Sequence, residues 1–209
     1  MRWLIALALT ALPAFAGGER AGEFDYYVLS LSWSPTYCAI EGDAKGDDQC
    51  DPRHDYSFTL HGLWPQFENG WPSYCPTAER PPSRGQTAGM VDIMGSSGLA
   101  WYEWKKHGVC SGLSPQDYFA ASRRAYEQVA IPDVFLRLRK DLTLPASVVE
   151  AAFVDANPEL GPNMITITCD HGHIREARIC LTRDFAFRSC GPDAARDCRM
   201  KDARMEAVR

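Results

Sequence analysis

The decapeptide WYEWKKHGVC, residues 101–110, brings a carboxylate, an ammonium group and an imidazole within about one helical turn. If this stretch is helical, Glu103, Lys106 and His107 stand at i, i+3 and i+4 and share one face. The two tryptophans of the decapeptide point elsewhere, and we expect both to anchor the helix in the core. Gly108 is expected to stop the helix. One face thus carries groups suited to proton transfer at a centre that gains negative charge.

The first sixteen residues have the order typical of a secretory signal peptide. A positively charged start is followed by an apolar run and by the small-residue pattern AFA at residues 14–16. The run is too short to span a bilayer, so we predict a signal peptide over residues 1–16 and a mature domain over residues 17–209. A buried N-terminal helix is the alternative. No second long apolar run follows, and we expect export to a periplasm or the extracellular space without a membrane anchor.

All eight cysteines lie in the predicted mature domain. They are Cys38, Cys50, Cys75, Cys110, Cys169, Cys180, Cys190 and Cys198. An even number in an exported chain predicts four disulfides, although many pairings are possible. We expect a loop closed by Cys38 and Cys50, and Cys75 is a candidate partner for Cys110. Zinc binding is the rival interpretation, but the chain has neither a CxxC pair nor an HxxxH spacing.

The charge of the chain points to an enzyme more than to a nucleic-acid coat. The formal net charge is −5, the wrong sign for a high-affinity nucleic-acid binder. A polyanionic substrate would have to be held by a small local patch and then released. No internal repeat or linker divides the mature part, which is long enough for one domain with a sizeable core. We expect a monomer with no obligate protein partner.

Hydrophobic periodicity predicts a single α+β domain. Residues 24–33 alternate as a half-buried strand, and residues 57–61 form a second strand that Gly62 and Pro65 end. Further elements are predicted as strands at 164–169 and 174–181 joined by a turn at 170–173, and as helices at 90–94, 115–129, 132–141 and 145–156. The charged tail over residues 199–209 is expected to fray.

His61 is predicted at the end of the second strand, on the face opposite the core. A core histidine satisfied by a backbone carbonyl is the alternative. With His107 it supplies two imidazoles, which suit transesterification of RNA, where a base takes the 2′-hydroxyl proton and an acid protonates the departing 5′-oxygen. Lys106 would stabilise the extra negative charge of the phosphorane. Glu103 would orient or polarise neighbouring groups, or keep His107 charged. No metal is required, because the attacking oxygen belongs to the substrate.

Three segments carry a resemblance to a known family. The segments FTLHGLWP at residues 58–65 and EWKKHGVC at residues 103–110 resemble the two active-site segments of the ribonuclease T2 family. The segment DYYVLSLSWSP at residues 25–35 is similar to the family's opening strand. The resemblance implies an antiparallel sheet flanked by helices. It also implies metal- and cofactor-free cleavage of single-stranded RNA through a 2′,3′-cyclic phosphate, with low base specificity.

Site roles follow from the same resemblance, position by position. His107 resembles the general base and His61 the general acid, whereas Lys106 and Glu103 resemble the pair that stabilises the phosphate. Trp64 is expected to stack on a base, a contact worth about 1–3 kcal/mol in other single-strand binders, or else to serve as a packing residue. By similarity, the disulfides are Cys38–Cys50, Cys75–Cys110, Cys169–Cys198 and Cys180–Cys190.

The chain departs from the family pattern at Tyr102, where the family usually has a histidine that contacts substrate phosphate. A phenol still donates a hydrogen bond but brings no positive charge, so we expect weaker substrate binding or an altered pH profile. Val109 replaces a common threonine, and Gln66 occupies a position that resembles part of a base-binding pocket. Two rival functions stay open: a catalytically idle binding scaffold, and a metal-dependent exported hydrolase that a chelator would inactivate.

Overall fold

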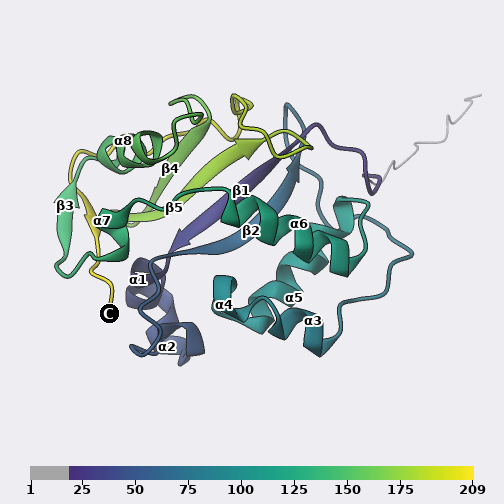
Figure 1. The fold of residues 1–209 in the computed structure, drawn as a ribbon, viewed down its shortest axis with the longest axis horizontal. Coiled ribbons are helices and arrows are strands. Elements are labelled where there is room, and N and C mark those ends of the chain that lie inside the picture. Colours follow the sequence, from purple (N-terminus) through teal and green to yellow (C-terminus); the bar gives the residue numbers. More distant parts are fainter. Residues whose placement is uncertain (1–18) are drawn as a thin grey trace, which may run out of the picture.

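The computed structural model describes residues 19–209, so the predicted signal peptide lies outside the described residues. Its centre is a six-stranded sheet (Figure 1). The strands are β1 Tyr26–Trp33, β2 Phe58–Gln66, β3 Leu142–Leu144, β4 Ile165–Asp170, β5 His173–Leu181 and β6 Ala203–Met205. They run in the order β2-β1-β5-β6-β3, with β4 on β5. All pairs are antiparallel except the single β5–β6 contact, so the predicted α+β sheet is confirmed.

Helices occupy two regions around the sheet. They are α1 Ser34–Tyr37, α2 Asp43–Lys45, α3 Arg84–Ala88, α4 Val91–Met94, α5 Ser97–Lys106, α6 Pro115–Glu127, α7 Asp133–Leu136 and α8 Ala146–Ala156, with short turns η1 Cys38–Gly42, η2 Asp48–Cys50 and η3 Gly108–Cys110. Helices α3 to α6 gather beside β2, whereas α7, α8 and β3 lie toward the other end (Figure 1). Among the described residues no helix is long and apolar enough to cross a membrane.

The side chains of β1 alternate between the two faces of the sheet, and each face packs in a separate apolar cluster. Leu29, Leu31 and Trp33 are fully buried in the main core beneath the helices. Tyr26 and Val28 point to the opposite face, where a smaller apolar cluster forms with the segment that follows β5. The face that carries Val28 also carries the functional residues described below.

Several helix predictions hold, and one is too long. Ser114 is the N-cap of helix α6, and its hydroxyl accepts a hydrogen bond from the backbone N–H of Asp117. Helix α8 closely matches the predicted helix at residues 145–156. The predicted helix at residues 132–141 ends after one turn at Leu136, because the chain must then extend into β3 to pair with β6.

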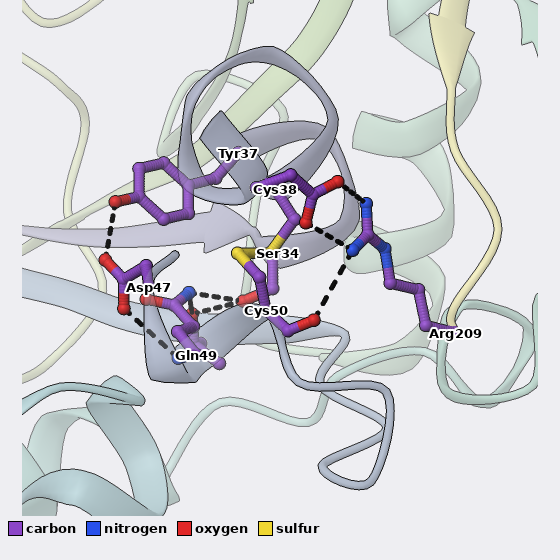
Figure 2. Close-up of a disulfide and its surroundings, with 9 residues drawn as sticks. Ser34, Tyr37, Cys38, Asp47, Gln49, Cys50 and Arg209 are labelled. Carbon is purple, nitrogen blue, oxygen red and sulfur yellow. Dashed lines mark hydrogen bonds and ion pairs between the residues drawn. A yellow bond between two sulfur atoms is a disulfide. The ribbon is translucent and has the colours of Figure 1, made fainter. Parts of the chain in front are cut away.

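The C-terminal tail is ordered, so the prediction that it frays is wrong. Strand β6 buries Ala203 and Met205 in the main core. The final residue, Arg209, donates hydrogen bonds to Asp43 and to the carbonyl of Cys50 (Figure 2). The high charge of the tail concealed its buried residues, which are Ala203, Met205, Glu206 and Val208.

The four disulfides that the family resemblance implied are all present: Cys38–Cys50, Cys75–Cys110, Cys169–Cys198 and Cys180–Cys190. No free cysteine is left in the described chain to supply a thiolate to zinc. Figure 2 shows the first bridge closing the loop that carries Asp47 and Gln49, which is tied back to Tyr37 and Ser34 by hydrogen bonds. The second bridge fixes the chain at the end of α5.

Candidate active site

His61 lies on a β-bulge in β2. Ser30 of β1 pairs with Gly62 and Leu31 pairs with Leu60, so His61 has no partner across the ladder. The extra residue shifts the alternation by one position, which lets both Leu60 and Leu63 face the main core. The prediction that β2 ends at Gly62 is therefore wrong, because a bulge absorbs the irregularity. The strand continues and places Trp64 and Gln66 on the cavity side.

Helix α5 delivers the second set of groups. It begins at Ser96, whose side chain accepts a hydrogen bond from the N–H of Leu99, and its last residue is Lys106. Of its two tryptophans, Trp104 is buried as predicted, but Trp101 is 43% exposed and does not anchor the helix. Gly108 does not take the left-handed conformation of a glycine stop. It is required for space, since a Cβ there would lie 2.5 Å from the ring of Trp104.

The two segments meet at one cavity of about 410 Å³. Every predicted site residue lines it: His61, Trp64, Tyr102, Glu103, Lys106 and His107. Gly62 makes the meeting possible, because a Cβ at that position would lie 2.0 Å from a carboxylate oxygen of Glu103. The helical spacing of the α5 residues and the bulge of β2 thus bring the two segments together at the cavity, although no covalent bond joins them.

His61 lies between two carboxylates. Its Nδ1 is 2.5 Å from Oε1 of Glu176, and its Nε2 is 3.6 Å from Oε1 of Glu103. Burial favours the neutral ring, but the charges of Glu176 and Glu103 outweigh it and raise the pKa of His61 above its ordinary value. This environment favours the protonated form of the imidazole. A core histidine satisfied by a backbone carbonyl, the alternative interpretation, is not what the structure contains.

Glu103 is almost fully buried between β2 and α5. Its Oε2 accepts a hydrogen bond of 2.6 Å from the indole N–H of Trp64. Burial raises the pKa of Glu103, although His61 and Lys106 partly oppose this effect by favouring the carboxylate. Glu103 therefore interacts with the imidazole of His61. It makes no contact with His107 that would keep the His107 ring charged.

His107 has the opposite environment. It caps the C-terminus of α5, is 5% exposed, and stacks on Trp64 with ring centroids 5.2 Å apart. Its Nδ1 is buried without a hydrogen-bond partner among residues 19–209. Burial, reinforced by the positive charges of Lys106 and His61, lowers the pKa of His107 to about 3. The ring is thereby held neutral and able to accept a proton.

The remaining predicted residues form the walls of the cavity. Trp64 lies between the two imidazoles, with its ring edge toward His61. Tyr102 is 43% exposed at the rim, and the ammonium group of Lys106 lies 5.9 Å from the centre of its ring. Gln66 is buried in the wall at the end of β2. A hydrogen-bond donor, the ammonium group of Lys106 and the aromatic rings of Trp64 and Tyr102 are thus arranged around the opening of the cavity.

Sequence reasoning missed the contribution of β5. Glu176 and Arg178 alternate with the buried Ala177 and project from the face that carries His61. Arg178 lines the cavity, and its guanidinium donates two hydrogen bonds to Oε2 of Glu176. The signal was that Glu176 and Arg178 alternate with the apolar residues Ala177 and Ile179. Trp71 and Asp193 also line the cavity, and both come from loops.

Across residues 19–209, no group of three His, Cys, Asp or Glu side chains is arranged to hold a metal ion.

The chain is similar to known proteins over most of its length. Residues 24–190 match the family model described as the Ribonuclease T2 family. A ribonuclease from Aeromonas hydrophila is 43% identical over 121 residues, which are 55% of this chain and 53% of that protein. The chain thus spans about half the length of that relative. Ribonuclease I from Escherichia coli (strain K12) is 25% identical over 227 residues, covering 85% of each chain.

A solved structure has the same fold. The RNase-related protein from Calystegia sepium aligns with a TM-score of 0.70 at 19% identity, covering 90% of this chain and 99% of that one. At this identity the likeness shows the fold alone. The family match covers most of the chain and includes both segments that meet at the cavity. The chain therefore belongs to the ribonuclease T2 family.

Proposed function

We propose that this protein is a metal-independent endoribonuclease that cleaves single-stranded RNA by transesterification through a 2′,3′-cyclic phosphate, with low base specificity. One observation carries the proposal: two imidazoles line the same cavity in opposite electrostatic environments. Neighbouring carboxylates favour the proton on His61, whereas burial and neighbouring cations remove it from His107. An acid and a base are thus available together over a range of pH.

The proposed reaction uses both rings in one step. Neutral His107 takes the proton of the 2′-hydroxyl, and the 2′-oxygen attacks the adjacent phosphorus. Protonated His61 gives its proton to the 5′-oxygen as the bond between that oxygen and phosphorus breaks. Lys106, which lines the same cavity, stabilises the negative charge that accumulates on the phosphorane. Glu103 orients His61 and fixes the indole of Trp64, against which a base stacks.

Substrate binding is proposed to rest on the walls of the cavity. The net charge of −5 repels RNA at long range, so binding relies on Lys106, Arg178 and the aromatic faces of Trp64 and Tyr102. Four disulfides support export to an oxidising compartment, either a periplasm or the extracellular space. We propose a monomer that needs no cofactor.

The decisive experiment is cleavage of a homopolymeric RNA by the oxidised mature protein in excess EDTA, with product analysis. His61→Ala and His107→Ala are assayed alongside. Cyclic-phosphate products from the wild type, lost in both variants, are the expected result. Activity that disappears in EDTA and returns with a divalent cation would favour the metal-dependent hydrolase. RNA binding without cleavage under any condition would favour the binding scaffold.

A further inference from the structure

We infer that Glu176 of β5 is a positioning residue for the general acid, and that Arg178 holds it in place. This inference rests on the proposed function, because it concerns how His61 is oriented for proton donation. Glu176 contacts His61 but does not line the cavity. Its contribution would therefore act through His61 and not through contact with RNA.

The contact to His61 fixes which ring nitrogen can react. Oε1 of Glu176 lies 2.5 Å from Nδ1 of His61, so this nitrogen carries the proton that is held within the pair. The other nitrogen, Nε2, lies on the side of Glu103. A carboxylate on Nδ1 sets the ring orientation and leaves the Nε2 proton as the one that can be transferred.

Arg178 divides the two oxygens of Glu176 between two partners. The Nε and Nη2 atoms of Arg178 donate to Oε2 at 2.8 and 2.6 Å, which leaves Oε1 for the imidazole. Arg178 is itself held over the ring of Trp64, 5.2 Å from its centre. Although burial disfavours the carboxylate, the positive charges of His61 and Arg178 lower the pKa of Glu176 to about 2. Glu176 therefore stays charged throughout the pH range in which His61 titrates.

The bulge of β2 explains how His61 contacts a residue of β5. β5 does not pair with β2 directly, since β1 lies between them. The bulged His61 has no ladder partner, and its ring contacts Glu176, which pairs with Ser32 of the intervening strand; Arg178 pairs with Ser30 of the same strand. Two serines on the intervening strand leave room for this contact. Larger side chains there would separate the acid from its support.

The same chain contains a matched control. On the same sheet, Nδ1 of His173 lies 2.7 Å from Oε1 of Glu206, and Arg204 contacts that oxygen at 3.1 Å. None of these three residues lines the catalytic cavity. Glu206→Gln therefore removes an equivalent carboxylate from a histidine that has no proposed role in the reaction.

The test compares Glu176→Gln with Glu206→Gln by kcat and KM across pH, in EDTA. The groups that face His61 are Glu103, Lys106 and His107 on the α5 side and Glu176 and Arg178 on β5. Removing the charge of Glu176 should move the alkaline limb of the kcat profile toward acid by about one pH unit or more, with KM little changed. Activity on that limb should fall about tenfold for each unit. Glu206→Gln should leave the limb in place.

An NMR titration of the His61 ring gives a readout that does not depend on catalysis. We expect its pKa to be lower in Glu176→Gln than in the wild type, and to be restored toward the wild-type value in Glu176→Asp. An unchanged ring pKa and an unchanged alkaline limb in Glu176→Gln would overturn the inference. If that variant does not fold, Glu176→Ser provides the neutral side chain, and an unchanged ring pKa and alkaline limb there would overturn the inference equally.

The outcomes separate this inference from the proposed function. Full activity of His61→Ala would overturn the proposed acid, and the ring titration would then still report whether Glu176 controls His61. Loss of activity in His61→Ala together with a wild-type profile in Glu176→Gln would leave the proposed function intact and remove only the role of Glu176.

Discussion

The two sides of the cavity each carry a histidine, and they place it in opposite electrostatic environments. On the strand side, His61 is partly exposed and lies between two carboxylates, Glu103 and Glu176. On the helix side, His107 is buried against Trp64, and its Nδ1 finds no partner among the described residues. The first environment raises the pKa of its ring and the second lowers it to about 3.

This difference shows that the surroundings decide the protonation state of each histidine. In water both rings would titrate near the same pH, and neither would be reserved for one role. Placing acidic groups beside one ring, and burying the other ring beside a cation, separates the two titrations. The predictions below test this asymmetry, from the largest expected effect to the smallest.

Removing either ring should have the largest effect on cleavage. Because each ring contributes proton transfer, we expect kcat to fall by about 10²–10⁴-fold in both His61→Ala and His107→Ala. In the wild type, activity should rise with pH as His107 loses its proton and fall at higher pH as His61 loses its own. Residual activity in His61→Ala should lack the alkaline limb, and that in His107→Ala the acidic limb. A wild-type profile that does not fall at alkaline pH would contradict this assignment.

Adding a side chain at Gly62, where β2 approaches Glu103 of α5, should have the next largest effect. A Cβ at residue 62 would lie 2.0 Å from Glu103 and 2.5 Å from the indole nitrogen of Trp64. Gly62→Ala should therefore displace Glu103, lower kcat by about 100-fold and destabilise the fold by about 1–3 kcal/mol. Gly98→Ala in α5 is the control, because its Cβ would meet nothing closer than 3.5 Å. Wild-type activity in Gly62→Ala would show that Glu103 need not approach β2.

The disulfide at the end of α5 should matter for activity as well as stability. Replacing both Cys75 and Cys110 by alanine opens a loop of 35 residues, which we expect to cost about 4 kcal/mol in the free energy of unfolding. Because the bridge fixes the chain three residues beyond His107, kcat should also fall several-fold. Replacing Cys38 and Cys50, whose separation is 12 residues, should cost about 3 kcal/mol and leave kcat unchanged.

Denaturant titration and cleavage assays at a temperature where both variants are folded provide the measurement. Equal kcat in the two double variants would contradict a specific role for the bridge near α5.

The smallest effect is expected at the rim of the cavity. Tyr102→His introduces a ring that becomes charged at acidic pH at the rim of the cavity. We expect KM to fall by a few-fold below pH 6, with kcat little changed, because one charged contact to phosphate strengthens substrate binding by about 1 kcal/mol. Tyr102→Phe is the control and should raise KM slightly by removing the donor. A KM for Tyr102→His that is independent of pH would contradict the expected phosphate contact.

Much of the site could be predicted from local sequence. Glu103, Lys106 and His107 share a helix face because their spacing in the chain determines it, and the alternation of residues 24–33 reveals β1 for the same reason. The bulge left a readable trace, since apolar residues in β2 occur at Leu60 and then at Leu63. The exposure of Trp101 could not be predicted in this way, because a tryptophan is compatible with either the core or the cavity rim.

By itself, the sequence determined which groups carry the proposed chemistry and which elements hold them, because both depend on spacing along the chain. Only the tertiary structure decided how those groups are charged. Glu176 is 115 residues from His61, and the antiparallel pairing of β1 with β5 brings them into contact. Burial and the nearest charges set a pKa, and both are properties of residues that are neighbours in space and distant in sequence.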